Sequence, residues 1–334
     1  MPEPIDVNQF DRVLRGLREG YQKKRMDSNC YPPFDRPLIE STDKEWNGTY
    51  EHSWWYEDEK ANIRYLRIYD VPGTLSGNIL RLLDNIPPII GDCEIQGNEI
   101  RPVEDAPPPP PEDEFHDDSE DVTAQLALLP LVSVDPQKHF LKKPKYASEI
   151  NNQLLCQGGL CPGTPLCLNI VQLLGKTNDG RLVFPKYKTR QNSLIRVHAL
   201  DTYKSWILQI LRSLQTLHGL GIAHRDLRID NMVWSHDDRT LFLCDLEGRW
   251  GNFGAPELLK NASLDAGWSP ATDIWDLGSC IKGLLYGNAP INHYVEEEAW
   301  KVPAPFTTIV EACEQKDPKQ RPALDELMRM VEAI

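Results

Sequence analysis

The sequence predicts an α+β fold, in which strand patterns precede residue 190 and helix patterns dominate after residue 200. Residues 65–69 (Tyr-Leu-Arg-Ile-Tyr) alternate with period two, as half-buried strands do. Residues 201–218 instead repeat apolar side chains at helical spacing, which forms one buried stripe. With 334 residues, of which 40% are apolar, the chain can form one large or two modest domains with a real core.

Much of the formal net charge of −14 lies in one segment, because residues 104–121 contain nine acids and no Lys or Arg. A negative balance argues against a general nucleic-acid binder. Within this segment, residues 107–111 are five consecutive prolines, a stiff and solvated stretch that cannot bury a core. We therefore expect residues 101–121 to be an acidic, Pro-rich linker or an inserted loop.

The cysteines and the hydropathy pattern bear on the compartment. The eight cysteines include no C-x-x-C pair, which favours reduced structural thiols over a zinc site. Residues 1–20 are charged throughout, unlike a signal peptide, and no apolar run approaches membrane-spanning length. We expect an intracellular protein, cytoplasmic or nuclear, that binds neither membrane nor nucleic acid.

The first hundred residues contain a helix pattern and a strand pattern. Val7–Arg25 predicts an amphipathic helix, either a docking helix or, as the better interpretation, a solvated surface helix. Trp46–Val71 is aromatic and strand-like. Gly73–Gly77 predicts a turn, since it lacks the G-x-G-x-x-G spacing of a phosphate-covering loop.

The elements of the middle and the end of the chain follow in order. Leu126–Val134 and His139–Lys143 predict two strands, and Tyr146–Cys156 predicts a short helix. Two further strands and three helices are predicted over Leu168–Gly175, Arg181–Tyr187, Asp201–His218 (with Asp201 as N-cap), the segment that starts at Ser269-Pro270, and Leu324–Val331.

Five short motifs carry the functional signal. His224–Asn231 fits H-R-D-L-x-x-x-N, the pattern of the protein-kinase catalytic loop. An apolar strand then ends in Asp245, fourteen residues after Asn231. Residues 255–257 are Ala-Pro-Glu, and the segments 273–278 and 317–322 complete the set. In this order the motifs resemble the eukaryotic protein-kinase superfamily over roughly residues 135–334.

The resemblance implies a two-lobed protein-kinase-like fold, with a divergent β-rich small lobe and a helical C-lobe. The kinase-like domain would cover residues 122–334, with a hinge near 185–188. Residues 1–100 would be an N-terminal extension that could contribute strands to the small lobe.

The same resemblance implies roles for the motif residues. Asp226 would orient the acceptor hydroxyl, and Arg228 could touch the transferred phosphate. Asn231 and Asp245 would hold Mg²⁺. Glu247 replaces the glycine of D-F-G, so that the triplet is Asp-Leu-Glu, similar to the D-F-E of choline-kinase-like enzymes, where the added acid lies near the metals.

The nucleotide contacts are expected in the small lobe. Lys142 is the candidate for the phosphate-binding lysine and Lys143 the alternative, because only one of two adjacent strand residues can point into the cleft. Glu149 is the only acid between Lys142 and the next predicted strand, which makes it the candidate ion partner.

The strand that leads into the hinge supplies the remaining nucleotide contacts. By resemblance Phe184 is the gatekeeper, and the carbonyl of Pro185 and the N–H of Tyr187 would face adenine. Proline is tolerable where only a carbonyl is needed.

These assignments predict an ATP- and Mg²⁺-dependent phosphotransferase, with Ser or Thr of an unknown protein as the favoured acceptor. One alternative is a small-molecule, choline-kinase-like enzyme, which the short segment between Asp245 and Ala255 favours. The other is a pseudokinase that binds nucleotide or partners, which the missing glycine-rich loop favours. Residues 246–254 contain no Ser, Thr or Tyr, so we expect no phosphorylation switch within them.

Overall fold

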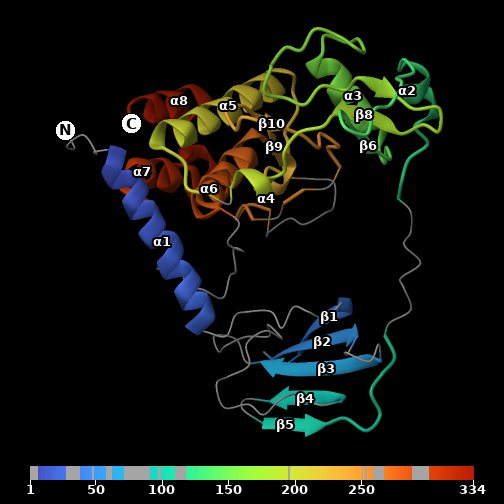
Figure 1. The fold of residues 1–334 in the computed structure, drawn as a ribbon, viewed down its shortest axis with the longest axis vertical. Coiled ribbons are helices and arrows are strands. Elements are labelled where there is room, and N and C mark those ends of the chain that lie inside the picture. The colour runs from blue at the N-terminus through green and yellow to red at the C-terminus, as the bar shows by residue number, and fades with distance from the viewer. Residues whose placement is uncertain are drawn as a thin grey trace. The chain divides into compact units, whose positions relative to one another are not determined.

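The computed structural model describes residues 7–27, 38–46, 49–57, 62–70, 91–96, 99–109, 118–194, 196–249, 251–252, 254–258, 267–287 and 301–334. The turn expected at Gly73–Gly77 and residues 110–117 of the acidic segment lie outside these ranges. The chain forms two compact units (Figure 1). The kinase-motif unit contains residues 1–17, 118–290 and 301–334, and the N-terminal unit contains residues 18–117 and 291–300.

The N-terminal unit is built on a five-stranded sheet in the order β1-β2-β3-β4-β5. All pairs are antiparallel except β3–β4. The strands are β1 (Leu38–Trp46), β2 (Thr49–Glu57), β3 (Ile63–Asp70), β4 (Cys93–Gln96) and β5 (Glu99–Pro102). The sequence left open that this region adds strands to the small lobe; the described pairings of these strands all lie within their own sheet.

The kinase-motif unit begins with a second, three-stranded sheet in the order β6-β8-β7. It contains β6 (His139–Lys142), β7 (Gly175–Lys176) and β8 (Leu182–Pro185), and helix α3 (Ala147–Cys156) accompanies it. Ile150 of α3 is buried in one apolar cluster with Leu173, Leu182 and Phe184. This packing fixes α3 against the sheet and so determines which way its polar residues point.

The rest of this unit is mainly helical (Figure 1). It contains α4 (Arg190–Ser193), α5 (Leu200–Gly219), α6 (Pro270–Tyr286), α7 (Ala304–Cys313) and α8 (Leu324–Glu332), with the two-stranded ribbon of β9 (Met232–Trp234) and β10 (Leu241–Leu243). The predicted stripe of α5 is fully buried, and Ser269 caps α6 with a capping box, as Ser269-Pro270 predicted.

Helix α1 (Val7–Asp27) confirms the helix predicted over Val7–Arg25, but it is more than a solvated surface helix. Phe10 and Leu14 are buried, and the ring of Phe10 lies 6.0 Å from that of Tyr203 and 5.9 Å from that of Phe306. The start of α1 therefore belongs to the core of the kinase-motif unit.

Two predicted strands and one predicted cap were wrong. In place of a strand over Leu126–Val134, the chain forms α2 (Thr123–Ala127) and an irregular segment with one bridge from Leu131 to Lys176. Ala, Gln and Leu favour the helix, and Pro130 lacks the N–H that a ladder needs. Of the strand expected over Leu168–Gly175, only an isolated bridge at Ile170 and Gly175, the first residue of β7, remain. Helix α5 is capped by Ala199, with Asp201 in its first turn.

Within the described residues, no helix combines the length and the apolar character that crossing a bilayer requires.

Candidate active site

A pocket of about 380 Å³ opens between the three-stranded sheet and the β9–β10 ribbon. Apolar side chains form much of its wall, and a few charged or amide groups converge on it, as is typical of ligand sites. Its lining includes Phe140, Lys142, Glu149, Gln153, Val171, Phe184, Pro185, Lys186, Tyr187, Thr189, Asp230, Asn231, Val233, Cys244 and Asp245. The predicted nucleotide residues therefore all face one cavity.

Lys142 is surrounded by carboxylates. Its Nζ atom lies 2.7 Å from Glu149 Oε1, 2.5 Å from Asp245 Oδ1 and 3.5 Å from Glu247 Oε2. Burial alone would lower the pKa of Lys142, but attraction to Glu149 and Asp245 outweighs it and holds this pKa above its ordinary value. Lys143 is exposed and does not line the pocket.

Helix α3 presents two pairs of polar residues at i,i+4 spacing. Glu149 and Gln153 are 1% exposed and line the pocket. Ser148 and Asn152 instead bind the backbone of the Asp-Leu-Glu triplet: the Ser148 hydroxyl donates to the carbonyl of Glu247, and Asn152 Nδ2 donates to that of Leu246 at 2.8 Å. The helix thus fixes both the lysine partner and the chain that carries Asp245.

Asp245 and Arg225 both have left-handed backbones, with φ of 66° and 71°. Such strain in residues other than glycine persists only where neighbouring groups impose it. At Arg225 the buried carboxylate of Asp273 supplies part of that force, because it accepts the N–H groups of His224 at 2.8 Å and Arg225 at 2.9 Å. His218 binds the same carboxylate at 2.8 Å.

Asn231 holds Asp226 in place. Its Nδ2 atom donates to Asp226 Oδ2 at 2.8 Å and to the Asp226 carbonyl at 2.9 Å. This orientation leaves the Asn231 Oδ1 atom as an acceptor beside Asp245 in the pocket wall. The side chain of Asp226 is 32% exposed, so that its carboxylate is open to solvent.

These donors fit a magnesium ion. Mg²⁺ takes oxygen ligands and is usually held by one or two carboxylates together with substrate phosphates. Asp245 and Asn231 supply such oxygens, with Glu247 near Lys142 as a further carboxylate. Among the described residues no group of three or more His, Cys, Asp or Glu side chains is placed to hold a metal by itself.

Arg228 lies near two carboxylates of the octapeptide motif. Its guanidinium, in a side chain that is 56% exposed, is 3.9 Å from Asp226 Oδ2 and 3.6 Å from Asp230 Oδ2. Arg190 of α4 forms a 2.7 Å ion pair with the other Asp230 oxygen. Asp230 had no assigned role in the sequence, although it lies within the octapeptide motif.

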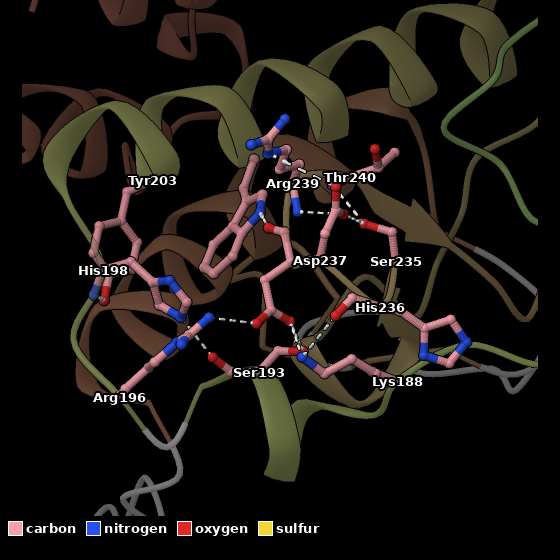
Figure 2. Close-up of polar contacts among 12 residues, drawn as sticks. Lys188, Ser193, Arg196, His198, Tyr203, Ser235, His236, Asp237, Arg239 and Thr240 are labelled. Carbon is pink, nitrogen blue, oxygen red and sulfur yellow. Dashed lines mark hydrogen bonds and ion pairs between the residues drawn. The ribbon is translucent and has the colours of Figure 1, made fainter.

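The chain that follows Tyr187 is anchored by one buried carboxylate, that of Asp238 in the turn between β9 and β10. It accepts from Lys188 Nζ at 2.5 Å, Ser193 Oγ at 2.8 Å and Arg196 at 2.8 Å; Figure 2 labels these three residues and draws polar contacts as dashed lines. The Lys188 backbone also pairs with Trp234 on β9. Tyr187, stacked on Phe242 with centroids 4.3 Å apart, is thereby held in the pocket wall.

The sequence missed several residues of this region. Ser148, Asn152, Gln153 and Asp238 lie in none of the five motifs. For the first three, the available signal was helical spacing, because residues four apart lie on one face of a helix, so Gln153 shares a face with Glu149 and Asn152 with Ser148. Asp238 gave no such signal, since an Asp in a turn is usually only a turn residue.

The buried carboxyl group of Asp276 in α6 has a raised pKa. Its carboxyl is 1% exposed, and burial followed by repulsion from Asp273 and Asp226 raises its pKa to about 9. Between pH 3.8 and about 9, the folded chain therefore keeps a proton that the unfolded chain releases, so its contribution to stability falls as the pH rises.

We expect Asp276→Asn, which has the shape of the protonated acid, to raise the melting temperature relative to the parent, and by more at pH 8 than at pH 5. Thermal unfolding at both values and at pH 6.5 measures this. A difference that does not change with pH would contradict the assigned protonation.

Curated protein kinases match parts of the chain at low identity. Calcium-dependent protein kinase 25 of Arabidopsis thaliana is 34% identical over 100 residues, which cover 27% of this chain and 19% of that protein. The membrane-associated tyrosine- and threonine-specific cdc2-inhibitory kinase of Drosophila melanogaster is 27% identical over 163 residues, covering 40% and 30%. SNF-related serine/threonine-protein kinase of Rattus norvegicus is 28% identical over 153 residues, covering 38% and 20%.

Each of these matches spans less than a third of the relative's own length. No family model matches the chain. The matches support a protein-kinase-like superfamily and a kinase-like function. The mixed α and β content of the chain is compatible with that fold class.

Proposed function

We propose that the chain is an ATP- and Mg²⁺-dependent phosphotransferase whose acceptor is Ser or Thr of a protein, built on a two-lobed kinase-like fold. The observation that carries the proposal is the convergence of Lys142, Glu149, Asp245 and Asn231 on one pocket, with Asp226 hydrogen-bonded to Asn231. These are the groups that phosphoryl transfer needs to position phosphates, metal and acceptor hydroxyl.

Each side chain has one task in this scheme. Lys142, oriented by Glu149, would hold the nucleotide phosphates, while Asp245 and Asn231 would hold Mg²⁺. The metal would neutralise phosphate charge. Asp226 would orient the acceptor hydroxyl and accept its proton. The wall formed by Phe184, Pro185 and Tyr187 would receive the adenine.

A small-molecule kinase is the second candidate, and one observation favours it. Glu247 Oε2 lies 3.5 Å from Lys142 Nζ, so the triplet directs a third carboxylate to the phosphate-binding lysine. The Asp245–Ala255 segment is also short for presenting a peptide. A pseudokinase that binds partners is the remaining alternative.

Two measurements separate these functions. Thermal shift of the full chain with ATP and Mg²⁺, against ATP with EDTA, tests metal-dependent nucleotide binding. Mass spectrometry of reactions with a peptide library and with a panel of hydroxyl-bearing metabolites identifies the acceptor. No shift and no product would overturn the proposal, and phosphorylated metabolites without phosphopeptides would favour the small-molecule enzyme.

We also expect activity without activation-segment phosphorylation, because residues 246–254 contain no hydroxyl side chain. Protein made in bacteria and treated with phosphatase should retain its full turnover number, with the phosphate-free mass confirmed by intact mass spectrometry. Loss of most of the turnover after this treatment would show that a phosphorylated acceptor lies elsewhere in the chain.

A further inference from the structure

Next to the candidate catalytic residue, the backbone of Arg225 is held from two sides. Its left-handed φ of 71° is unfavourable for a residue with a Cβ. Asp273 accepts its N–H at 2.9 Å, and its carbonyl accepts the backbone N–H of Asn252 at 2.9 Å. Asp226 follows directly, so these two contacts set the direction in which the catalytic loop presents its carboxylate.

Asn252 is itself held at three further points. Its Nδ2 atom donates to Asp276 Oδ1 at 2.9 Å, and its Oδ1 atom accepts the N–H of Gly254 at 3.1 Å. Its carbonyl accepts the indole N–H of Trp268 at 3.0 Å. A residue bound at four points cannot shift without breaking several hydrogen bonds, which makes it a firm support for Arg225.

Gly251 brings this support close to the loop. A Cβ at this position would lie 2.5 Å from Trp268 Nε1 and 2.8 Å from the carbonyl oxygen of Arg225, closer than Cβ atoms approach such groups. Only glycine lets the segment pass between the indole and the catalytic loop. The close packing of residue 251 against Trp268 and the Arg225 carbonyl therefore depends on glycine at this position.

Trp268 also forms a cation–π contact with Arg225. The guanidinium carbon lies 5.7 Å from the centre of the indole ring, within cation–π range. In phosphorylation-dependent kinases, an arginine pairs with a phosphorylated activation segment to order it. Here the segment has no hydroxyl residue between 246 and 254, and an aromatic face lies beside the arginine instead.

We propose that Asn252 is a positioning residue which, with Trp268, holds the catalytic loop in its working conformation without phosphorylation. Asn252 acts through Arg225 on Asp226 and touches neither nucleotide nor acceptor. The inference deepens the proposed phosphotransferase function and rests on it for its consequence in turnover. This clamp, by which Asn252 and Trp268 hold Arg225, is a property of the folded chain that can be measured without catalysis.

The test compares full-length variants by hydrogen exchange of the peptide that covers residues 222–232, in protein shown by mass to carry no phosphate. Asn252→Ala removes the bonds to Asp276 and Gly254. Trp268→Leu removes both the indole N–H and the aromatic face, whereas Trp268→Phe keeps an aromatic face. Asn178→Ala, in an exposed turn, is the matched control.

We expect the loop to exchange roughly tenfold faster in Asn252→Ala and Trp268→Leu, about what the loss of one or two hydrogen bonds allows. Trp268→Phe should fall between these and the parent, and Asn178→Ala should match the parent. In the active enzyme, kcat should fall by about the same factor, with the KM for ATP within about twofold of the parent.

Unchanged exchange in both Asn252→Ala and Trp268→Leu overturns the clamp, as does a parent loop that is protected only after phosphorylation. If one of these variants does not fold, Trp268→Phe decides, because it is the mildest change. A parent that shows no turnover but has the expected exchange pattern overturns the proposed enzyme and leaves the clamp established.

Discussion

Lys142→Met is expected to weaken ATP binding by roughly 10- to 100-fold, the range for losing hydrogen bonds that involve a charged group. Lys142 Nζ is within 2.7 Å of both Glu149 Oε1 and Asp245 Oδ1, so the variant loses the cation that these carboxylates share. Titration calorimetry with ATP and Mg²⁺ measures the change.

Lys143→Met is the matched control, because Lys143 is the adjacent lysine but is exposed and outside the pocket. Its ATP affinity should stay within about twofold of the parent. Equal losses in both variants, or the larger loss in Lys143→Met, would contradict the assignment of Lys142.

The loss of Lys142 should also change the protonation of its partner. Burial already raises the pKa of Glu149, although Lys142 opposes this shift. Without the lysine, we expect Glu149 to bind a proton at neutral pH, since a buried carboxylate is costly without a countercharge. If Lys142→Met stays folded and the pKa of its Glu149 is raised further, the loss of ATP binding is not caused by unfolding.

The pairing of Lys142 with Glu149 shows how much of the candidate site could be predicted from the sequence. Motif order suggested both residues, and the structure explains their short separation of seven positions: β6 ends at Lys142, and Glu149 lies in the first turn of α3. Motif order, and the absence of any other acid between Lys142 and the next predicted strand, suggested the pair that the structure brings to 2.7 Å, whereas its role in catalysis stays a prediction.

Contacts between segments that lie far apart in the chain could not be predicted from the sequence. Asn152 and Leu246 are 94 positions apart, and nothing in either segment marks their hydrogen bond. The strand expected over Leu126–Val134 failed for the opposite reason. Its apolar run satisfied the local pattern, but Pro130 and the preceding helix formers prevented a ladder. Single-sequence patterns identify motif residues well and their supporting residues poorly.

Asp226→Asn should lower turnover by roughly 10² or more, the scale for losing a positioned general base. The substitution removes the charge and keeps the shape, because an Asn side-chain oxygen can still accept from Asn231 Nδ2, now 2.8 Å from Asp226 Oδ2. Since Asp226 does not line the pocket, ATP–Mg²⁺ affinity should stay near that of the parent. An interaction made only in the transition state lowers kcat without raising KM.

Asp245→Asn provides the contrast. Asp245 lines the pocket beside Lys142, so this variant should lose both ATP–Mg²⁺ affinity and turnover. Asp237→Asn is the control, because its side chain is 60% exposed in the β9–β10 turn. Steady-state kinetics and calorimetry on the three variants measure both quantities. Full turnover in Asp226→Asn would contradict the role of Asp226 as the base. An equal loss of ATP–Mg²⁺ affinity in Asp226→Asn and Asp245→Asn would contradict the assignment of Asp245 as metal ligand and Asp226 as base.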